Sequence, residues 1–119
     1  MPVNDGRRAN AGELIWIDFG QPTGHEQAGH RPGLVISSAG YNHISSLMLV
    51  CPITSNSRPW PFKVPFSPVG GLRGFILADQ LRSIDPTARS LKRSGYHVPE
   101  ETLAAVRGII AAVIGVEVK

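Results

Sequence analysis

Apolar residues along the chain gather into short runs that are separated by turn-forming residues. Short apolar runs bounded by Gly, Pro, Asn or Ser are typical of β-strands. A proline within such a run cannot donate to a ladder, so the strand containing Pro65 is expected at a sheet edge or with a bulge. The predicted strands cover residues 14–19, 33–36, 47–51, 62–66 and 74–78, with a sixth extended segment around 81–84.

A different spacing marks the C-terminal part of the chain. Pro99 suits the first position of a helix, and the two glutamates that follow it suit the positive end of the helix dipole. Gly115 is a natural stop, and Gly108 inside the helix predicts close packing there, because glycine costs about 1 kcal/mol relative to alanine. Apolar residues recur at helical spacing at Leu103, Val106, Ile110 and Val113. Short strands followed by one helix predict a small, mostly β barrel capped by a C-terminal helix.

Length and composition fit one domain. The 119 residues include ten prolines and thirteen glycines, which favour turns over a helical bundle. We expect the polar residues 1–11 to form a flexible N-terminal tail and residues 12–119 to form the domain. The chain shows neither a signal-peptide pattern nor a membrane-spanning apolar run, and its lone Cys51, in an apolar run, is expected to be a buried core thiol. These features predict a cytoplasmic protein.

Charge favours a partner that carries phosphate. Nine arginines and three lysines against nine acidic residues give a formal charge of +3. The guanidinium fork matches phosphate oxygens, so an arginine-rich balance is compatible with nucleic-acid binding. The four histidines lack the close pair spacing of a zinc site and there is one cysteine, so we expect no metal.

Two polar loops are candidates for chemistry, residues 20–32 and 54–61. If the strands around 33–36 and 47–51 pair antiparallel through a turn at residues 40–43, opposed residues share a constant number sum of 85. Arg31 and Thr54 satisfy this sum. The hairpin therefore places the guanidinium and the hydroxyl at the same end of the sheet.

Five blocks of sequence, in order, resemble the MazF/PemK family of toxins. The resemblance covers residues 12 to about 115, nearly the whole chain. The blocks are residues 12–18 with 24–32, 51–55, 60–64, 78–85 and 98–101.

This resemblance implies an SH3-like barrel of the CcdB/PemK type with a C-terminal helix, usually a homodimer that needs no cofactor. It implies an endoribonuclease that cuts single-stranded RNA without metal, through attack of a 2′-hydroxyl on the adjacent phosphate, leaving a 2′,3′-cyclic phosphate and a 5′-hydroxyl. It also implies a cognate antitoxin, whose acidic segment we expect across the basic RNA surface. The family's central arginine falls on Arg31 and its threonine on Thr54, while a histidine and a carboxylate fall on His25 and Asp79.

The reaction needs a stabiliser for the charged phosphorane and groups that move protons. Arg31 suits the first role and is too basic to act as a free base, and Thr54 can donate a hydrogen bond to a non-bridging oxygen. His25 has the most suitable pKa for proton transfer, and Glu26 or Asp79 could serve if desolvated. The further candidates for RNA binding are Glu26, Gln27, His30, Ser55, Asn56, Arg58, Trp60, Gln80 and Arg82.

Other interpretations remain open for the same residues. Arg31 could be an ordinary surface arginine, Thr54 a turn residue and Asp79 a group that bonds backbone at a strand end. Trp16 and Phe62 are expected in the core. The chain could instead be a CcdB-like toxin that binds DNA gyrase, or a barrel that holds RNA without cutting it, because a fold alone does not fix function.

Overall fold

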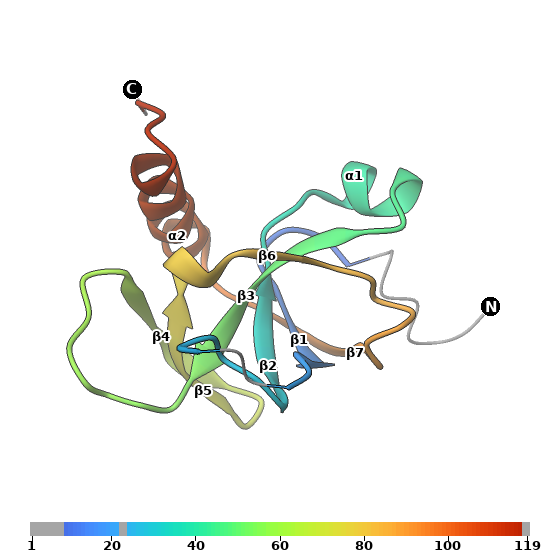
Figure 1. Ribbon diagram of the computed structural model, residues 1–119, viewed down its shortest axis with the longest axis horizontal. Coiled ribbons are helices and arrows are strands. Elements are labelled where there is room, and N and C mark those ends of the chain that lie inside the picture. Colours follow the sequence, from blue (N-terminus) through green and yellow to red (C-terminus); the bar gives the residue numbers. More distant parts are fainter. Residues whose placement is uncertain (1–8, 22–23, 118–119) are drawn as a thin grey trace.

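The computed structural model describes residues 9–21 and 24–117, and its centre is a curled sheet with one long helix packed against it (Figure 1). Strand order is β4-β5-β3-β2-β1-β7, and β6 pairs with β3. The elements are β1 (Glu13–Asp18), β2 (His30–Val35), α1 (Ala39–Ile44), β3 (Met48–Thr54), β4 (Lys63–Val69), β5 (Leu72–Leu77), the 3-10 turn η2 (Ala78–Gln80), β6 (Arg82–Ile84), β7 (Lys92–His97) and α2 (Glu100–Val113).

Strand β3 is central and determines where the polar residues meet. One side of β3 pairs with β2, in a register where every pair has the expected sum of 85, from Gly33 with Pro52 to Val35 with Val50. The predicted register is therefore confirmed, although a short helix, α1, replaces the expected turn. The other side of β3 pairs first with β6 and then, at Ile53 and Thr54, with β5. Between β5 and β6 lies η2, so η2 is held beside the middle of β3.

Successive side chains of a strand belong to two different apolar clusters, because they point to opposite faces of the sheet. Leu14 belongs to a cluster that also contains Val106 of α2, whereas its neighbour Ile15 belongs to a second cluster. The predicted strand at 62–66 is β4, which lies at the sheet edge and has a register shift between Phe66 and Val69, as Pro65 indicated.

Several details differ from the expectations. Val113 is 51% exposed, and a Cβ on Gly108 would meet nothing within 4 Å, so the predicted close packing at Gly108 is wrong. Trp16 and Phe62 are only partly buried, so the expectation that both lie in the core is wrong; Trp16 packs against the rim of one apolar cluster. Strand β2 begins at His30, so Arg31 lies in a strand and not in the loop.

Strand β7 was not predicted, since its residues are mostly polar. It is attached to β1 by Glu13, whose side chain is fully buried and accepts two hydrogen bonds from Arg93, of 2.6 and 2.7 Å. Ser94 adds a bond from its hydroxyl to the carbonyl of Leu14. Polar pairing therefore holds an edge strand that apolar patterning could not reveal.

The expected tail, residues 1–11, falls mostly outside the described residues, which begin at residue 9. Ala9 is fully buried, and the side-chain oxygen of Asn10 accepts hydrogen bonds from the backbone of Ala11 and Ala39. Residues 9–11 are therefore part of the folded domain rather than of the tail. No helix in the described part of the chain is long and apolar enough to cross a membrane.

Candidate functional site

The guanidinium of Arg31 lies at the end of β3, and residues of the loop that precedes β2 hold it there. Its Nε donates a 2.8 Å hydrogen bond to the carbonyl of Ala28, and its Nη1 donates to the side-chain oxygen of Gln27. The same Nη1 lies 3.5 Å from the carbonyl of Ile53, the residue before Thr54. Arg31 is thus half-buried and fixed in direction beside the threonine, and part of its fork remains for an anion.

Thr54 is the last residue of β3 and is 6% exposed. Its Oγ1 accepts a 3.2 Å hydrogen bond from the backbone N–H of Asn56, which directs the chain away from the strand. A hydroxyl that accepts one bond keeps a proton to donate. Arg31 and Thr54 therefore lie at the same end of β3, although the observed pairing of β2 with β3 ends at Gly33 and Pro52, and Thr54 pairs instead with Phe75.

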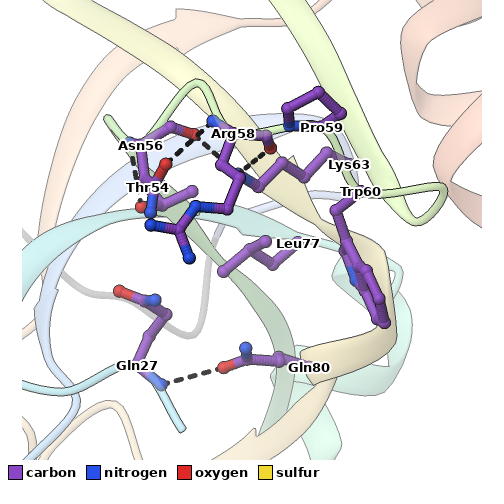
Figure 2. Close-up of a pocket in the computed structure, with 9 residues that line it drawn as sticks. All are labelled: Gln27, Thr54, Asn56, Arg58, Pro59, Trp60, Lys63, Leu77 and Gln80. Carbon is purple, nitrogen blue, oxygen red and sulfur yellow. Dashed lines mark hydrogen bonds between the residues drawn. The ribbon is translucent and has the colours of Figure 1, made fainter. Parts of the chain in front are cut away.

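A pocket of about 210 Å³ opens over Thr54 and collects several of the predicted residues (Figure 2). Lys63 forms part of its wall and donates two 2.7 Å hydrogen bonds, to the carbonyls of Asn56 and Arg58. The lining residues are Gln27, Thr54, Asn56, Arg58, Pro59, Trp60, Lys63, Leu77 and Gln80. We call this the site pocket. Two cations and three amide side chains suit it to a phosphate and a polar base.

Gln27 and Gln80 join the first loop to η2 across this pocket. The backbone N–H of Gln27 donates a 2.9 Å hydrogen bond to the side-chain oxygen of Gln80, which Figure 2 shows as a dashed line. Gln27 also accepts from Arg31, so the chain of contacts runs from η2 to the guanidinium.

Asp79 lies on the outer side of η2, next to Trp60. Its Oδ2 accepts a 3.1 Å hydrogen bond from the indole N–H of Trp60, and Trp60 packs edge-to-face on Phe62 with ring centroids 5.2 Å apart. A neighbouring pocket of about 260 Å³ is lined by Glu26, Asp79, Gln80, Leu81 and Arg82. Asp79 is thus beside the site pocket but not among its lining residues.

Some predicted residues line neither pocket, and Arg31 is one of them. His25 is exposed in the loop, His30 stacks on Trp16 with ring centroids 6.2 Å apart, and Ser55 is exposed. Arg82, by contrast, lines the neighbouring pocket; its guanidinium lies over the ring of Phe19 and donates to the carbonyl of Phe19 at 3.3 Å.

Lys63 and Leu77 were missed as site residues. Lys63 stands between Phe62 and Val64 in an otherwise apolar run, and a charged residue in an apolar segment can indicate a functional role. Nothing in the sequence marked Leu77 as a site residue, because its place in the pocket wall depends on its pairing with Lys63 across β4 and β5.

Cys51 lies beneath η2 as an inert thiol. It is fully buried, and its Sγ lies 3.9 Å from the carbonyl of Ala78. Burial, with a smaller contribution from the charge of Asp79, raises the pKa of this thiol to about 12. The expectation of a core cysteine is confirmed. Across residues 9–21 and 24–117, no group of three or more His, Cys, Asp or Glu side chains has an arrangement that could hold a metal ion.

The model of one protein family, described as PemK-like, MazF-like toxins of type II toxin–antitoxin systems, matches residues 10–114. The chain belongs to this family. It is 43% identical over 105 residues to the endoribonuclease toxin MazF of Escherichia coli K12, over 87% of this chain and 92% of that protein. It is 37% identical over 105 residues to the endoribonuclease PemK of Escherichia coli, over 84% of this chain and 78% of that protein.

Solved structures of MazF-type toxins share the fold. The crystal structure of MazF from Deinococcus radiodurans matches with a TM-score of 0.84 and 40% identity, over 90% of this chain and 96% of that one. A MazE–MazF structure from the same organism matches with a TM-score of 0.80 and 36% identity, over 92% of this chain and 99% of that one. The expected mostly β fold with a C-terminal helix is confirmed.

Proposed function

We propose that this MazF-like toxin is a sequence-selective endoribonuclease that cuts single-stranded RNA without a metal ion. The cut is a transesterification in which a ribose 2′-hydroxyl attacks the adjacent phosphate, leaving a 2′,3′-cyclic phosphate and a 5′-hydroxyl. The observation that carries the proposal is the placement of the Arg31 guanidinium at the end of β3, 3.5 Å from the carbonyl of Ile53, the residue before Thr54. The relatives named as endoribonucleases, at 35–43% identity, support the same activity.

In this mechanism Arg31 stabilises the charge that develops on the phosphorane. A preorganised donor of this kind contributes more to the transition state than to the bound substrate, because the non-bridging oxygens gain charge as the bond forms. The bonds from Arg31 to Ala28 and Gln27 hold the fork in place before the substrate arrives. The hydroxyl of Thr54 donates a hydrogen bond to a second non-bridging oxygen of the same phosphate.

Proton transfer is assigned to groups around the rim of the site. One group removes the proton of the 2′-hydroxyl and another protonates the leaving 5′-oxygen. Our candidates are Asp79 and Glu26, which line the neighbouring pocket, and His25, which lies in the adjoining loop. Asp79 accepts a hydrogen bond from Trp60, which lines the site pocket, and this bond holds the carboxylate of Asp79 beside that pocket.

Substrate binding uses the remaining polar residues. Gln27, Asn56 and Gln80 present amides that can hydrogen-bond base edges, and Arg58 supplies charge for the backbone. Arg82, Glu26 and Trp60 extend this surface, whereas His30 and Ser55, also candidates from the sequence, line neither pocket. Because base edges are exposed in single strands and hidden in A-form helices, amides in a pocket favour an unpaired substrate.

We further propose that the toxin acts in the cytoplasm as a homodimer and is neutralised by an antitoxin. The MazE–MazF structure of Deinococcus radiodurans supports a protein partner of that kind. The net charge of +3 favours an acidic antitoxin segment across the RNA surface. A monomeric mass by light scattering at micromolar concentration would refute the dimer, and an antitoxin that binds together with RNA would refute the shared surface.

The test of the reaction is to incubate purified protein with a long RNA in excess EDTA and to analyse the ends. Cleavage should proceed, and the new 5′ ends should accept phosphate from a polynucleotide kinase without prior phosphatase treatment. Cleavage that EDTA abolishes and magnesium restores would overturn the metal-free mechanism. New ends that carry a 5′-phosphate would overturn the transesterification.

A further inference from the structure

A second, more apolar pocket lies beside the site pocket and shares a wall with it. Its volume is about 450 Å³, within the range of small-molecule sites. Four residues belong to both pockets: Arg58, Pro59, Trp60 and Lys63. The second pocket adds Ser57, Pro61, Pro65 and Phe75. We call it the aromatic–proline pocket.

Sheet pairing places the two pockets on one face. Phe75 is opposite Thr54 across β5 and β3, and it is opposite Pro65 across β5 and β4. Directly paired residues present their side chains on the same face of a sheet. Thr54 lines the site pocket, whereas Phe75 and Pro65 line the aromatic–proline pocket, so the floor runs continuously from the proposed cleavage site to the ring of Phe75.

Residues 55–62 form the wall of both pockets that faces this floor, and the side chain of Lys63 holds this segment in place. The ammonium of Lys63 lies 5.6 Å from the centre of the Phe75 ring and bonds the carbonyls of Asn56 and Arg58. Trp60 is 48% exposed, yet its indole N–H is bonded to Asp79. An exposed aromatic ring held in this way can bind a flat partner at little entropic cost.

We propose that the aromatic–proline pocket is a second nucleotide subsite, which binds the base of a nucleotide next to the one that is cut. This proposal rests on the proposed function. Faces of Phe75, Trp60 and three prolines suit stacking, which tolerates any base, and Arg58 and Lys63 at the shared wall suit the phosphate between the two nucleotides.

RNA fits this pocket better than an acidic peptide, because the pocket is continuous with the place where the scissile phosphate is bound. A strand cut beside Thr54 must continue past one wall of the site pocket. The wall with Arg58 and Lys63 offers it both charge and a stacking surface. The site pocket therefore selects the base, and the second pocket adds affinity with little selectivity.

The test uses Phe75→Leu, which keeps apolar volume but removes the ring, with Tyr41→Leu on α1 as the matched control, since Tyr41 is also a half-exposed aromatic residue. The substrate is an RNA oligonucleotide centred on a mapped cut site, and a copy with a 2′-deoxy nucleotide before the scissile phosphate measures binding alone. Phe75→Leu should raise KM and the Kd of the copy about 10-fold with kcat unchanged. Phe75→Tyr should restore binding, and Tyr41→Leu should have no effect.

A scan with abasic nucleotides identifies the base concerned. At one position next to the cut, removing the base should weaken binding to the wild type about 10-fold and to Phe75→Leu hardly at all, because both changes remove one contact. Pro61→Ala, in the exposed part of the wall, should show the same pattern to a smaller degree without touching the core.

Losses that multiply at every position, or an unchanged KM in Phe75→Leu, would overturn the subsite. Intact RNA binding together with weaker antitoxin binding in Phe75→Leu would also overturn it and would assign the pocket to the antitoxin. Wild-type protein that cuts the 2′-deoxy copy would refute the proposed attack by the 2′-hydroxyl instead, so the two failures can be distinguished.

Discussion

The side-chain oxygen of Gln80 accepts a 2.9 Å hydrogen bond from the backbone N–H of Gln27, a residue 53 positions earlier in the chain. Gln27 in turn accepts a hydrogen bond from Arg31. The turn η2 is therefore hydrogen-bonded to the loop that orients the guanidinium of Arg31. A residue that contributes no charge is placed to influence the charge stabilisation at the site.

Removing this link should slow the chemistry while preserving the fold. Gln80→Ala should lower kcat about 5- to 10-fold, since one hydrogen bond of about 1 kcal/mol no longer holds the loop and Arg31 becomes less ordered. Gln80→Glu should recover part of the loss, because a carboxylate also accepts from the Gln27 N–H. Single-turnover cleavage rates measure the effect, and an unchanged kcat in Gln80→Ala would show that Gln27 does not need this bond.

The hydroxyl of Thr54 should matter more than its shape. Thr54→Val keeps the buried volume and removes the donor, so cleavage should fall about 10- to 100-fold. The free energy of unfolding should fall by only about 1 kcal/mol through the lost bond from Asn56. Thr54→Ser should retain most activity. A valine variant that cuts like wild type would remove Thr54 from the mechanism.

The buried carboxylate of Glu13 should contribute to stability and not to cleavage. Glu13 is fully buried, and Arg93, its bidentate partner, has a side chain 31% exposed. Glu13→Gln should lower the free energy of unfolding by about 2–3 kcal/mol, because it leaves the guanidinium incompletely paired near the core. Urea denaturation measures this change, with cleavage per folded molecule as the control. A loss below about 0.5 kcal/mol would mean that β7 is held by other contacts.

The thiol of Cys51 should be unreactive in the native protein. Its pKa is raised from 9.0 to about 12, so the folded state keeps its proton where the unfolded state would lose it. This protonation contributes stability that is fully present below pH 9 and is lost as the pH rises toward 12. At pH 8 iodoacetamide should label the protein only in denaturant, and Cys51→Ala should still cut RNA. Fast labelling of the native protein would contradict the buried position.

The sequence allowed the register of β2 and β3 to be predicted, because two short apolar strands joined by a symmetric connection leave few alternatives. It did not reveal β7, since Lys92–His97 is polar and its attachment depends on the buried charge of Glu13. The placement of Arg31 and Thr54 at the same end of β3 followed from that register. The roles of Lys63 and Gln80 did not, because both depend on how β4, η2 and the two loops meet in three dimensions.

His25 illustrates another limit of the sequence. An imidazole is a common proton carrier, yet that of His25 is exposed and lines neither the site pocket nor the pocket beside it. Chemical suitability can be read from a residue type, whereas distance from the reacting atoms cannot. Asp79 and Glu26 line the neighbouring pocket and are therefore closer to the site pocket, but both are exposed, so they lack the desolvation that the sequence-based assignment required.

The most direct measurement is the initial rate at which Arg31→Ala cleaves a fluorogenic single-stranded oligonucleotide in EDTA, with circular dichroism melts as the folding control. Truncation of Arg31 should slow cleavage about 10²- to 10³-fold, since a preorganised donor to the phosphorane is lost. Arg31→Lys should recover only part of the rate, because it keeps the charge without the fork. An Arg31→Ala protein that melts like wild type and cuts within about threefold of its rate would contradict the account and move the active site elsewhere.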